Sequence, residues 1–300
     1  MKHKKNIWHC AGFLLGLVII LALLSCVFRR KDGIYVYDAL SVSVKSNDIK
    51  AEPDNSLDVI FYGDSEAYSS FSPNHLYSKF GYTSFCCGTA AQKVCDTYAL
   101  LTEAFKTQSP KVIVLEANCL YRTLNEEDNK KDLVMNFLTD SVPVFANHST
   151  WKLFARKALP SGREKRRRGQ KGFVLRKDSR PYKGGKYMKK TKKADELSSD
   201  VTAYLNKIAT LCKENNAELL IVSTPSPRNW TYKKHNGVQS WASLHGITYI
   251  DLNLDEEIKI NWKKDTKDSG DHLNYSGAKK VTNYMGKYFQ EHYNLTDHRE

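Results

Sequence analysis

The chain alternates short apolar runs with amphipathic segments over most of its length. Extended β-branched and aromatic runs at 57–62, 82–86, 111–116, 218–223 and 248–252 predict strands. Apolar residues at helical spacing predict helices at 73–80, 91–107, 198–215, 237–244 and 276–291. The run from Val112 to Leu115 is apolar on both faces, which is typical of a central parallel strand. This alternation predicts an α/β fold, with three α/β/α layers and a mostly parallel sheet.

The N-terminal pattern is different. Ile7 to Phe28 form 22 residues without a charge, close to the roughly 20 that a membrane-spanning helix needs. We predict a single-pass cell-membrane protein in which residues 1–31 form a cytoplasmic tail and anchor and residues 32–300 an extracytoplasmic domain. A cleaved signal peptide is the alternative, although its apolar core is normally about 7–15 residues. A lipoprotein-like site at Leu23 to Cys26, with a lipidated Cys26, is a further alternative.

A basic insertion interrupts the α/β pattern between about 119 and 195. From Arg156 to Lys193 there are 17 Lys or Arg against two acids, whereas the whole chain has a net charge of only +13. The basic charge therefore belongs to one segment. It has few interleaved aromatic residues, so we expect no nucleic-acid partner. Seven cysteines without a CxxC pair give neither a zinc site nor a disulfide framework, and we expect no metal and no cofactor.

Candidate chemistry begins at Gly63-Asp64-Ser65, directly after the first predicted strand. A serine hydroxyl becomes a good nucleophile when a base takes its proton, and a strand-to-helix turn can present it. His272, in a carboxylate-rich loop before the last predicted helix, could be that base. Asp268 or Asp271 could orient its ring. The alternatives are a helix cap for Ser65 and a structural role for His272.

These residues resemble the four sequence blocks of SGNH/GDSL hydrolases across residues 57–290. The blocks are Gly63-Asp64-Ser65, Gly88 after the second strand, Asn118 after the third, and the Asp/His block. The apolar N-terminus and the run from His272 to Ala278 resemble a membrane-anchored bacterial subgroup found with cell-surface polymer acylation. That subgroup includes relatives of the teichoic acid D-alanyl transfer protein.

The resemblance implies a flavodoxin-like fold and roles for the matching residues. Ser65 would be the nucleophile and His272 the base. The backbone N–H groups of Ser65 and Gly88 and the side chain of Asn118 would form the oxyanion hole. A turn glycine and a loop cap are the alternatives for Gly88 and Asn118.

The chain departs from the family pattern at two positions. Glu66 stands where the family motif has Leu, and Ser269 stands where the family places its Asp, three residues before His272. We favour Asp268 over Asp271 as the orienting carboxylate, because Gly270 could let the loop bend back. A Ser-His dyad and a fold without catalysis stay open.

Two functional hypotheses follow. The first is a membrane-anchored serine esterase or acyltransferase that acts through an acyl-enzyme on O-acyl groups of a cell-envelope polymer. The second is a non-catalytic anchored protein whose basic insertion docks an anionic cell-wall polymer or a membrane-bound O-acyltransferase. Trp230 and Trp262 could stack on sugars or belong to the core, and His148 could contact substrate or be structural.

Overall fold

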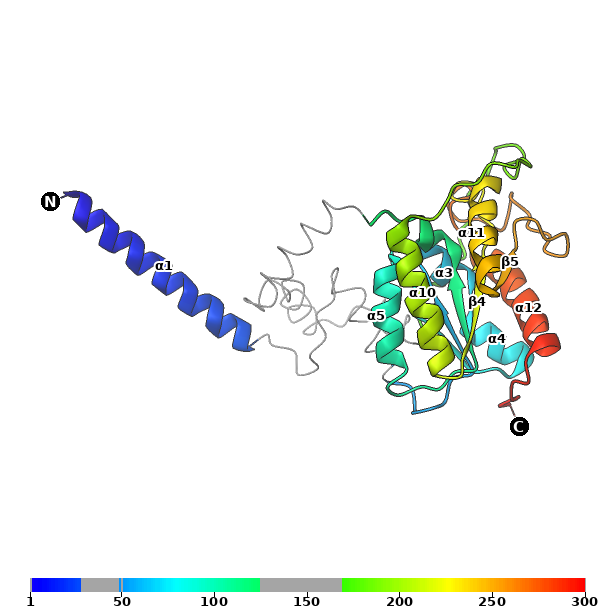
Figure 1. The fold of residues 1–300 in the computed structure, drawn as a ribbon, viewed down its shortest axis with the longest axis horizontal. Coiled ribbons are helices and arrows are strands. Elements are labelled where there is room, and N and C mark those ends of the chain that lie inside the picture. Colours follow the sequence, from blue (N-terminus) through cyan, green and yellow to red (C-terminus); the bar gives the residue numbers. More distant parts are fainter. Residues whose placement is uncertain (1, 28–48, 50, 125–168, 300) are drawn as a thin grey trace. The chain divides into compact units, whose positions relative to one another are not determined.

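The computed structural model describes residues 2–27, 49, 51–124 and 169–299 (Figure 1). The chain divides into two compact units, residues 1–44 with 125–161 and residues 45–124 with 162–300. His148 and most of the arginine-rich part of the basic insertion lie outside the described residues.

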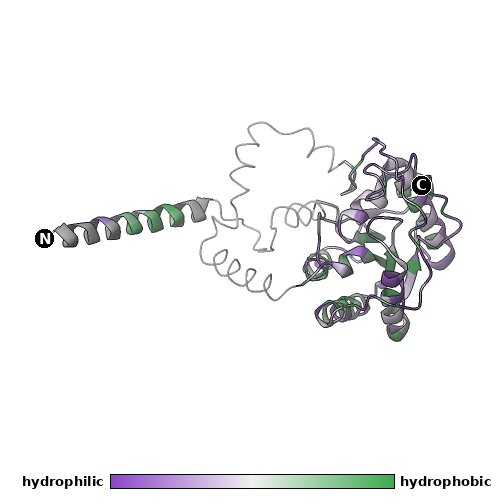
Figure 2. Ribbon diagram, turned by 90° about the horizontal axis from the view of Figure 1, so that it is seen from above, coloured by the Kyte–Doolittle hydropathy of each residue, from purple (hydrophilic) through white to green (hydrophobic). Residues whose placement is uncertain are grey.

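Helix α1 runs from Lys2 to Val27. Most of its described apolar side chains, among them Phe13, Leu14 and Ile20, are exposed, and Figure 2 colours the middle of the helix as hydrophobic. Across the residues that the structure describes, no helix combines the length and the apolar character needed to cross a membrane.

Five parallel strands form the central sheet in the order β2-β1-β3-β4-β5. Phe61 of β1 pairs with Cys86 of β2 on one side and with Val114 of β3 on the other. The predicted parallel α/β fold is therefore confirmed. The strands are β1 (Val59–Tyr62), β2 (Ser84–Cys86), β3 (Val112–Glu116), β4 (Glu218–Ser223) and β5 (Thr248–Asp251).

Helices cover both faces of this sheet. In Figure 1, α5 and α10 lie side by side on one face, whereas α4 and α12 lie on the other. The elements are α3 (Ser65–Ser70), α4 (Pro73–Phe80), α5 (Val94–Ala104), the 3-10 helix η1 (Ala117–Tyr121), α10 (Ser199–Glu214), α11 (Tyr232–His245) and α12 (Tyr275–His292).

Two predicted helix starts were wrong. Helix α11 begins at Tyr232 and not near Gly237, because the Thr231 side chain caps it by accepting a hydrogen bond from the N–H of Lys234. Its first turn is polar, and apolar periodicity therefore did not reveal it. Helix α5 begins at Val94 and not at Ala91, whose positive φ of 52° is incompatible with a helix.

The core fixes the ends of the central strands. Val59, Phe61 and Val114 pack with α12 in one buried cluster, and Phe61 stacks on Phe71 with ring centroids 4.5 Å apart. The alternate residues of the same strands, such as Ile60 and Ile113, are also fully buried. Because β1 and β3 are buried on both faces, the loops that follow them start from fixed positions.

The described end of the basic insertion is neither helix nor strand. Residues 174–182, which we call the strap, bind the domain through backbone hydrogen bonds. The strap contacts α3, the start of α12 and the loop that precedes α12. The contacts are Val174 N–H to Tyr68 O, Tyr275 N–H to Arg176 O, Arg180 N–H to Thr266 O and Tyr182 N–H to Trp262 O.

Candidate active site

The sequence-predicted site residues meet at the carboxyl edge of the sheet. In a sheet of order 2-1-3-4-5 the connections diverge on either side of β1 and β3, which opens a crevice beyond the ends of those two strands. Asp64 follows β1 and Asn118 follows β3, while His272 comes from the loop before α12. The fold thus brings three distant sequence blocks to one edge.

Gly63 and Asp64 shape the turn that carries Ser65. Gly63 has φ +140°, and a Cβ there would lie 2.7 Å from the Cβ of Glu116, so only glycine fits. The Asp64 carboxylate caps α3 by accepting a 2.9 Å hydrogen bond from the N–H of Glu66. Ser65 is the first residue of that helix and is only half-buried, unlike its neighbours on both sides.

Gly88 packs directly on this turn. A Cβ at Gly88 would lie 3.0 Å from the Cβ of Ala67 and 3.0 Å from the carbonyl oxygen of Asp64. Among the described residues, neither the Ser65 N–H nor the Gly88 N–H donates to an acceptor. Two backbone donors at the nucleophile turn are therefore left for a ligand, which is the arrangement that an oxyanion hole needs.

Asn118 is buried and contacts Asp64 of the same turn. Its Nδ2 donates a 2.8 Å hydrogen bond to Asp64 Oδ2, and its backbone N–H donates to Glu116 Oε2 at 3.0 Å. A carboxamide has two N–H groups. One holds Asp64 in place, and the second has no acceptor among the described residues.

Asp268 is the carboxylate that hydrogen-bonds to His272. Its Oδ2 lies 2.7 Å from Nδ1 of the ring, and its Oδ1 accepts the His272 backbone N–H at 2.6 Å. Asp271 Oδ2 lies farther away, 3.6 Å from Nδ1. Left-handed backbone at Ser269 (φ +63°) and Gly270 (φ +89°) turns the loop back, so that Asp268 reaches the ring.

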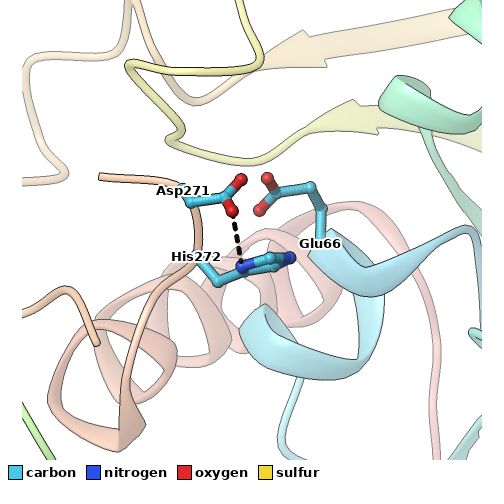
Figure 3. A group of neighbouring side chains, drawn as sticks. All are labelled: Glu66, Asp271 and His272. Atoms are coloured by element: carbon cyan, nitrogen blue, oxygen red, sulfur yellow. Dashed lines mark ion pairs between the residues drawn. The ribbon is translucent and has the colours of Figure 1, made fainter. Parts of the chain in front are cut away.

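No hydrogen bond joins Ser65 to His272 among the described contacts. Figure 3 shows the second ring nitrogen of His272 facing the start of α3. Glu66, the residue after Ser65, has a carboxylate oxygen within 4.8 Å of ligand atoms of both Asp271 and His272. Catalytic hydrogen bonds are often longer in the absence of substrate.

Three buried carboxyl groups lie behind the nucleophile turn. Burial raises the pKa of Glu66 well above its ordinary value, and the neighbouring Glu116 and Asp64 raise it further. Burial and Asp64 likewise raise the pKa of Glu116. Arg122 supplies a positive charge through Nε and Nη2, which lie 2.9 and 2.6 Å from Asp64 Oδ2. The Arg122–Asp64 ion pair and the two carboxyl groups with raised pKa values, Glu66 and Glu116, therefore surround the base of the turn that carries Ser65.

Asn229 joins the nucleophile side to the histidine side, and the sequence analysis did not find it. Its Nδ2 donates to Glu66 Oε1 at 2.6 Å and to Asp271 Oδ1 at 2.7 Å. Lys234 Nζ in turn donates to the Asn229 carbonyl at 2.7 Å. The sequence feature that could have indicated Asn229 is its place in the loop after β4, at the same carboxyl edge of the sheet as the other candidates.

Glu66, Asp271 and His272 also form a group whose ligand atoms could surround a metal ion (Figure 3). Asn229 already donates to both carboxylates, and Nδ1 of His272 already contacts Asp268. These contacts fit a hydrogen-bonded network between the two sides of the site, because an amide N–H group points toward the place that a cation would need.

The two tryptophans singled out from the sequence lie outside this crevice. Trp230 is buried and donates from Nε1 to Asp251 Oδ2 at 3.0 Å, which makes it a core residue. Trp262 packs edge-on against Tyr182 and Tyr187 of the insertion. No disulfide forms among the cysteines that the structure describes.

No family model and no curated protein matches this chain. Similar solved structures include a GDSL-like lipase from Bacteroides thetaiotaomicron, 10% identical, covering 84% of this chain and 98% of that one with a TM-score of 0.43. A lipase/acylhydrolase from Enterococcus faecalis is 8% identical, covers 79% and 97%, and has a TM-score of 0.42. The Clostridium thermocellum family 3 carbohydrate esterase is 13% identical, covers 80% and 96%, and has a TM-score of 0.38.

Proposed function

We propose that this protein is a serine esterase or acyltransferase that works through an acyl-enzyme. The observation that carries the proposal is the 2.7 Å contact between Asp268 and Nδ1 of His272, in a loop that faces the Ser65 turn. A carboxylate on Nδ1 leaves Nε2 as the ring nitrogen that accepts a proton and stabilises the imidazolium that forms.

In this proposal each residue has a step. His272 Nε2 takes the proton of Ser65 Oγ as the oxygen attacks an acyl carbonyl. The oxyanion of the tetrahedral intermediate is bound by the N–H groups of Ser65 and Gly88 and the free amide N–H of Asn118, with each such donor typically worth about 3 kcal/mol. His272 then returns the proton to the departing alcohol, which leaves the acyl group on Ser65. Water or a polymer hydroxyl attacks this ester with His272 again as base, giving hydrolysis or transfer.

The cellular setting in this proposal is the cell envelope. In this proposal the uncharged run from Ile7 to Phe28 attaches the protein to the membrane, and the exposed apolar side chains of α1 support this attachment. A membrane-attached domain with a strongly basic insertion fits a substrate that is an O-acylated, anionic cell-wall polymer. A membrane-bound O-acyltransferase is a fitting partner, because it would supply the acyl groups.

Replacement of the nucleophile tests the enzymatic part. Ser65→Ala should abolish both p-nitrophenyl acetate turnover and labelling by a fluorophosphonate probe. Ser199→Ala, the same change at an exposed serine of α10, should leave both unchanged. A folded wild-type protein that shows neither turnover nor labelling would refute the enzymatic proposal.

The second candidate is an anchored binding protein without catalysis, and the missing hydrogen bond between Ser65 and His272 favours it. Deletion of the basic insertion is a poor test, because the strap binds the loop that carries His272. Exchange of exposed lysines for glutamine is better. An enzyme should keep its turnover of a neutral ester after this exchange, whereas a binding protein would show no turnover at any stage and would lose polymer binding.

A further inference from the structure

A cavity of about 540 Å³ lies beside the histidine loop, between the end of the strap and the loop after β4. Its wall includes Ser269, three residues before His272, and Arg228, the neighbour of Asn229. The cavity therefore adjoins the candidate site without containing any of its predicted catalytic residues. Its lining residues are Arg180, Pro181, Tyr182, Lys183, Gly184, Arg228 and Ser269.

The charge of this cavity is entirely positive. Arg180, Lys183 and Arg228 line it, and no acidic residue does. The side chains of Arg180 and Lys183 have no hydrogen-bond or ion-pair partner among the described residues, and both residues are exposed. Arg228 uses only Nε, which donates to the Ser269 carbonyl at 3.0 Å. The donors of three cations are thus left facing one space.

The acidic residues of the histidine loop turn away from this space. Asp268 accepts hydrogen bonds from His272, and Asp271 accepts from Asn229 on the side of Glu66. Ser269 and Gly270, which stand between these two acids, hydrogen-bond to Arg228, and Ser269 also donates to Arg180 of the strap. The loop therefore separates an acidic, catalytic side from a basic side.

The backbone of the cavity is held to the loop that carries His272. The Ser269 N–H donates to the Arg180 carbonyl at 2.9 Å, and the Arg228 N–H donates to the Gly270 carbonyl at 3.2 Å. A Cβ at Gly270 would lie 2.7 Å from Cγ of Pro227 and 2.8 Å from Cδ2 of Tyr182, so the packing is close. The backbone at Arg180 and Arg228 is therefore held to the loop that carries His272.

We propose that this cavity is a substrate subsite that binds the oxyanion groups of an anionic polymer while an acyl group of that polymer enters the crevice at Ser65. The proposal rests on the proposed function. Arg side chains bind phosphate and carboxylate oxygens through paired N–H groups, and Lys adds a point charge. Both a phosphodiester and a uronate chain present such oxygens at repeated intervals, so one bound repeat would hold its neighbour near the nucleophile.

The test measures binding directly on the full-length protein by calorimetry, with tripolyphosphate and trigalacturonate as separate probes. The Arg180→Gln/Lys183→Gln double variant should bind the preferred probe at least about tenfold more weakly. The control is Lys189→Gln/Lys190→Gln, which removes the same charge from two exposed lysines farther along the insertion. It should change binding less than about twofold.

Both probes have informative outcomes. Tighter binding of tripolyphosphate indicates a phosphodiester substrate, and tighter binding of trigalacturonate indicates a uronate. Absence of binding to either probe, or equal weakening in the control, would overturn the subsite. Ser65→Ala should leave probe binding intact. If the wild-type protein binds a probe but shows no esterase activity, this result would count against the proposed function and not against the subsite.

Discussion

The nucleophile side and the histidine side of the candidate site are built in different ways. Gly63 and Asp64 belong to a turn fixed by its own strand and helix, and the residues around Ser65 are buried. His272 lies in a loop without regular structure, where Asp268 and Asp271 are partly exposed. One half of the site is rigid because of its local sequence, whereas the other half is held by distant segments.

Those distant segments are the strap and the loop after β4. Arg180 of the strap exchanges backbone hydrogen bonds with the histidine loop, and Asn274 donates to the carbonyls of Asp178 and Lys264. Asn229 then connects the loop to Glu66 on the nucleophile side. The orientation of the base thus depends on residues about 40 to 100 positions away in the sequence, and the basic insertion has a structural role at its C-terminal end.

The largest expected effect lies on the histidine side. Asp268→Asn should lower kcat/KM for p-nitrophenyl acetate about 10³-fold or more, equivalent to about 4 kcal/mol, because the amide can no longer stabilise the imidazolium. Asp271→Asn should cost much less, since Asp271 lies 3.6 Å from Nδ1. Equal losses for the two variants would show that the shorter contact of Asp268 does not decide the orientation of the ring.

The next effect tests the rigid turn. Gly63→Ala should destabilise the fold by about 3 kcal/mol, since its φ of +140° and the 2.7 Å approach to Glu116 both reject a Cβ. Urea unfolding measures this loss. Gly185→Ala is the matched control, because nothing lies within 4 Å of a Cβ at that position and it should change the free energy of unfolding little. A similar loss in both variants would show that the turn is not especially constrained.

The same contrast explains what the sequence could predict. Apolar runs placed all five strands, and their order along the chain put Ser65, Gly88 and Asn118 after successive strands. Such features are local. The sequence favoured Asp268 over Asp271 on the basis of Gly270 alone. The left-handed backbone at Ser269, which also turns the loop, could not be predicted, because serine rarely adopts it.

Asn229 shows the limit more clearly. Its role comes from two carboxyl groups that lie 163 and 42 positions away, and no spacing rule relates it to either. The contacts of the strap could not be predicted for a similar reason. They are backbone hydrogen bonds, which do not depend on the basic side chains that the sequence shows. Tertiary contacts of this kind leave no periodic pattern in one sequence.

A smaller effect compares a buried ion pair with an exposed one. Arg122→Met should destabilise the fold by about 2 kcal/mol, because it leaves Asp64 fully buried without its cation; the value is reduced since the arginine itself is partly exposed. Arg176→Met removes the partner of Asp178, where both side chains are about half exposed, and should cost less than about 1 kcal/mol. Urea unfolding at pH 7 measures both changes in the free energy of unfolding. A larger loss of stability in Arg176→Met than in Arg122→Met would contradict a stabilising role for the buried ion pair at the nucleophile turn.

The smallest effect concerns Glu66, which lies where the two sides meet, and it depends on pH. Because the pKa of Glu66 is higher in the folded than in the unfolded protein, the folded state binds more protons above about pH 4.5 and its stability falls as pH rises through that range. Glu66→Gln removes this titration and keeps the oxygen that accepts from Asn229. The variant should therefore match the wild type near pH 4 and become the more stable protein toward pH 7, whereas exposed Glu291→Gln should show no such trend. Urea unfolding at several pH values measures the difference, and a variant that loses stability relative to wild type as pH rises would mean that Glu66 is ionised and bound by a positive charge in the folded protein.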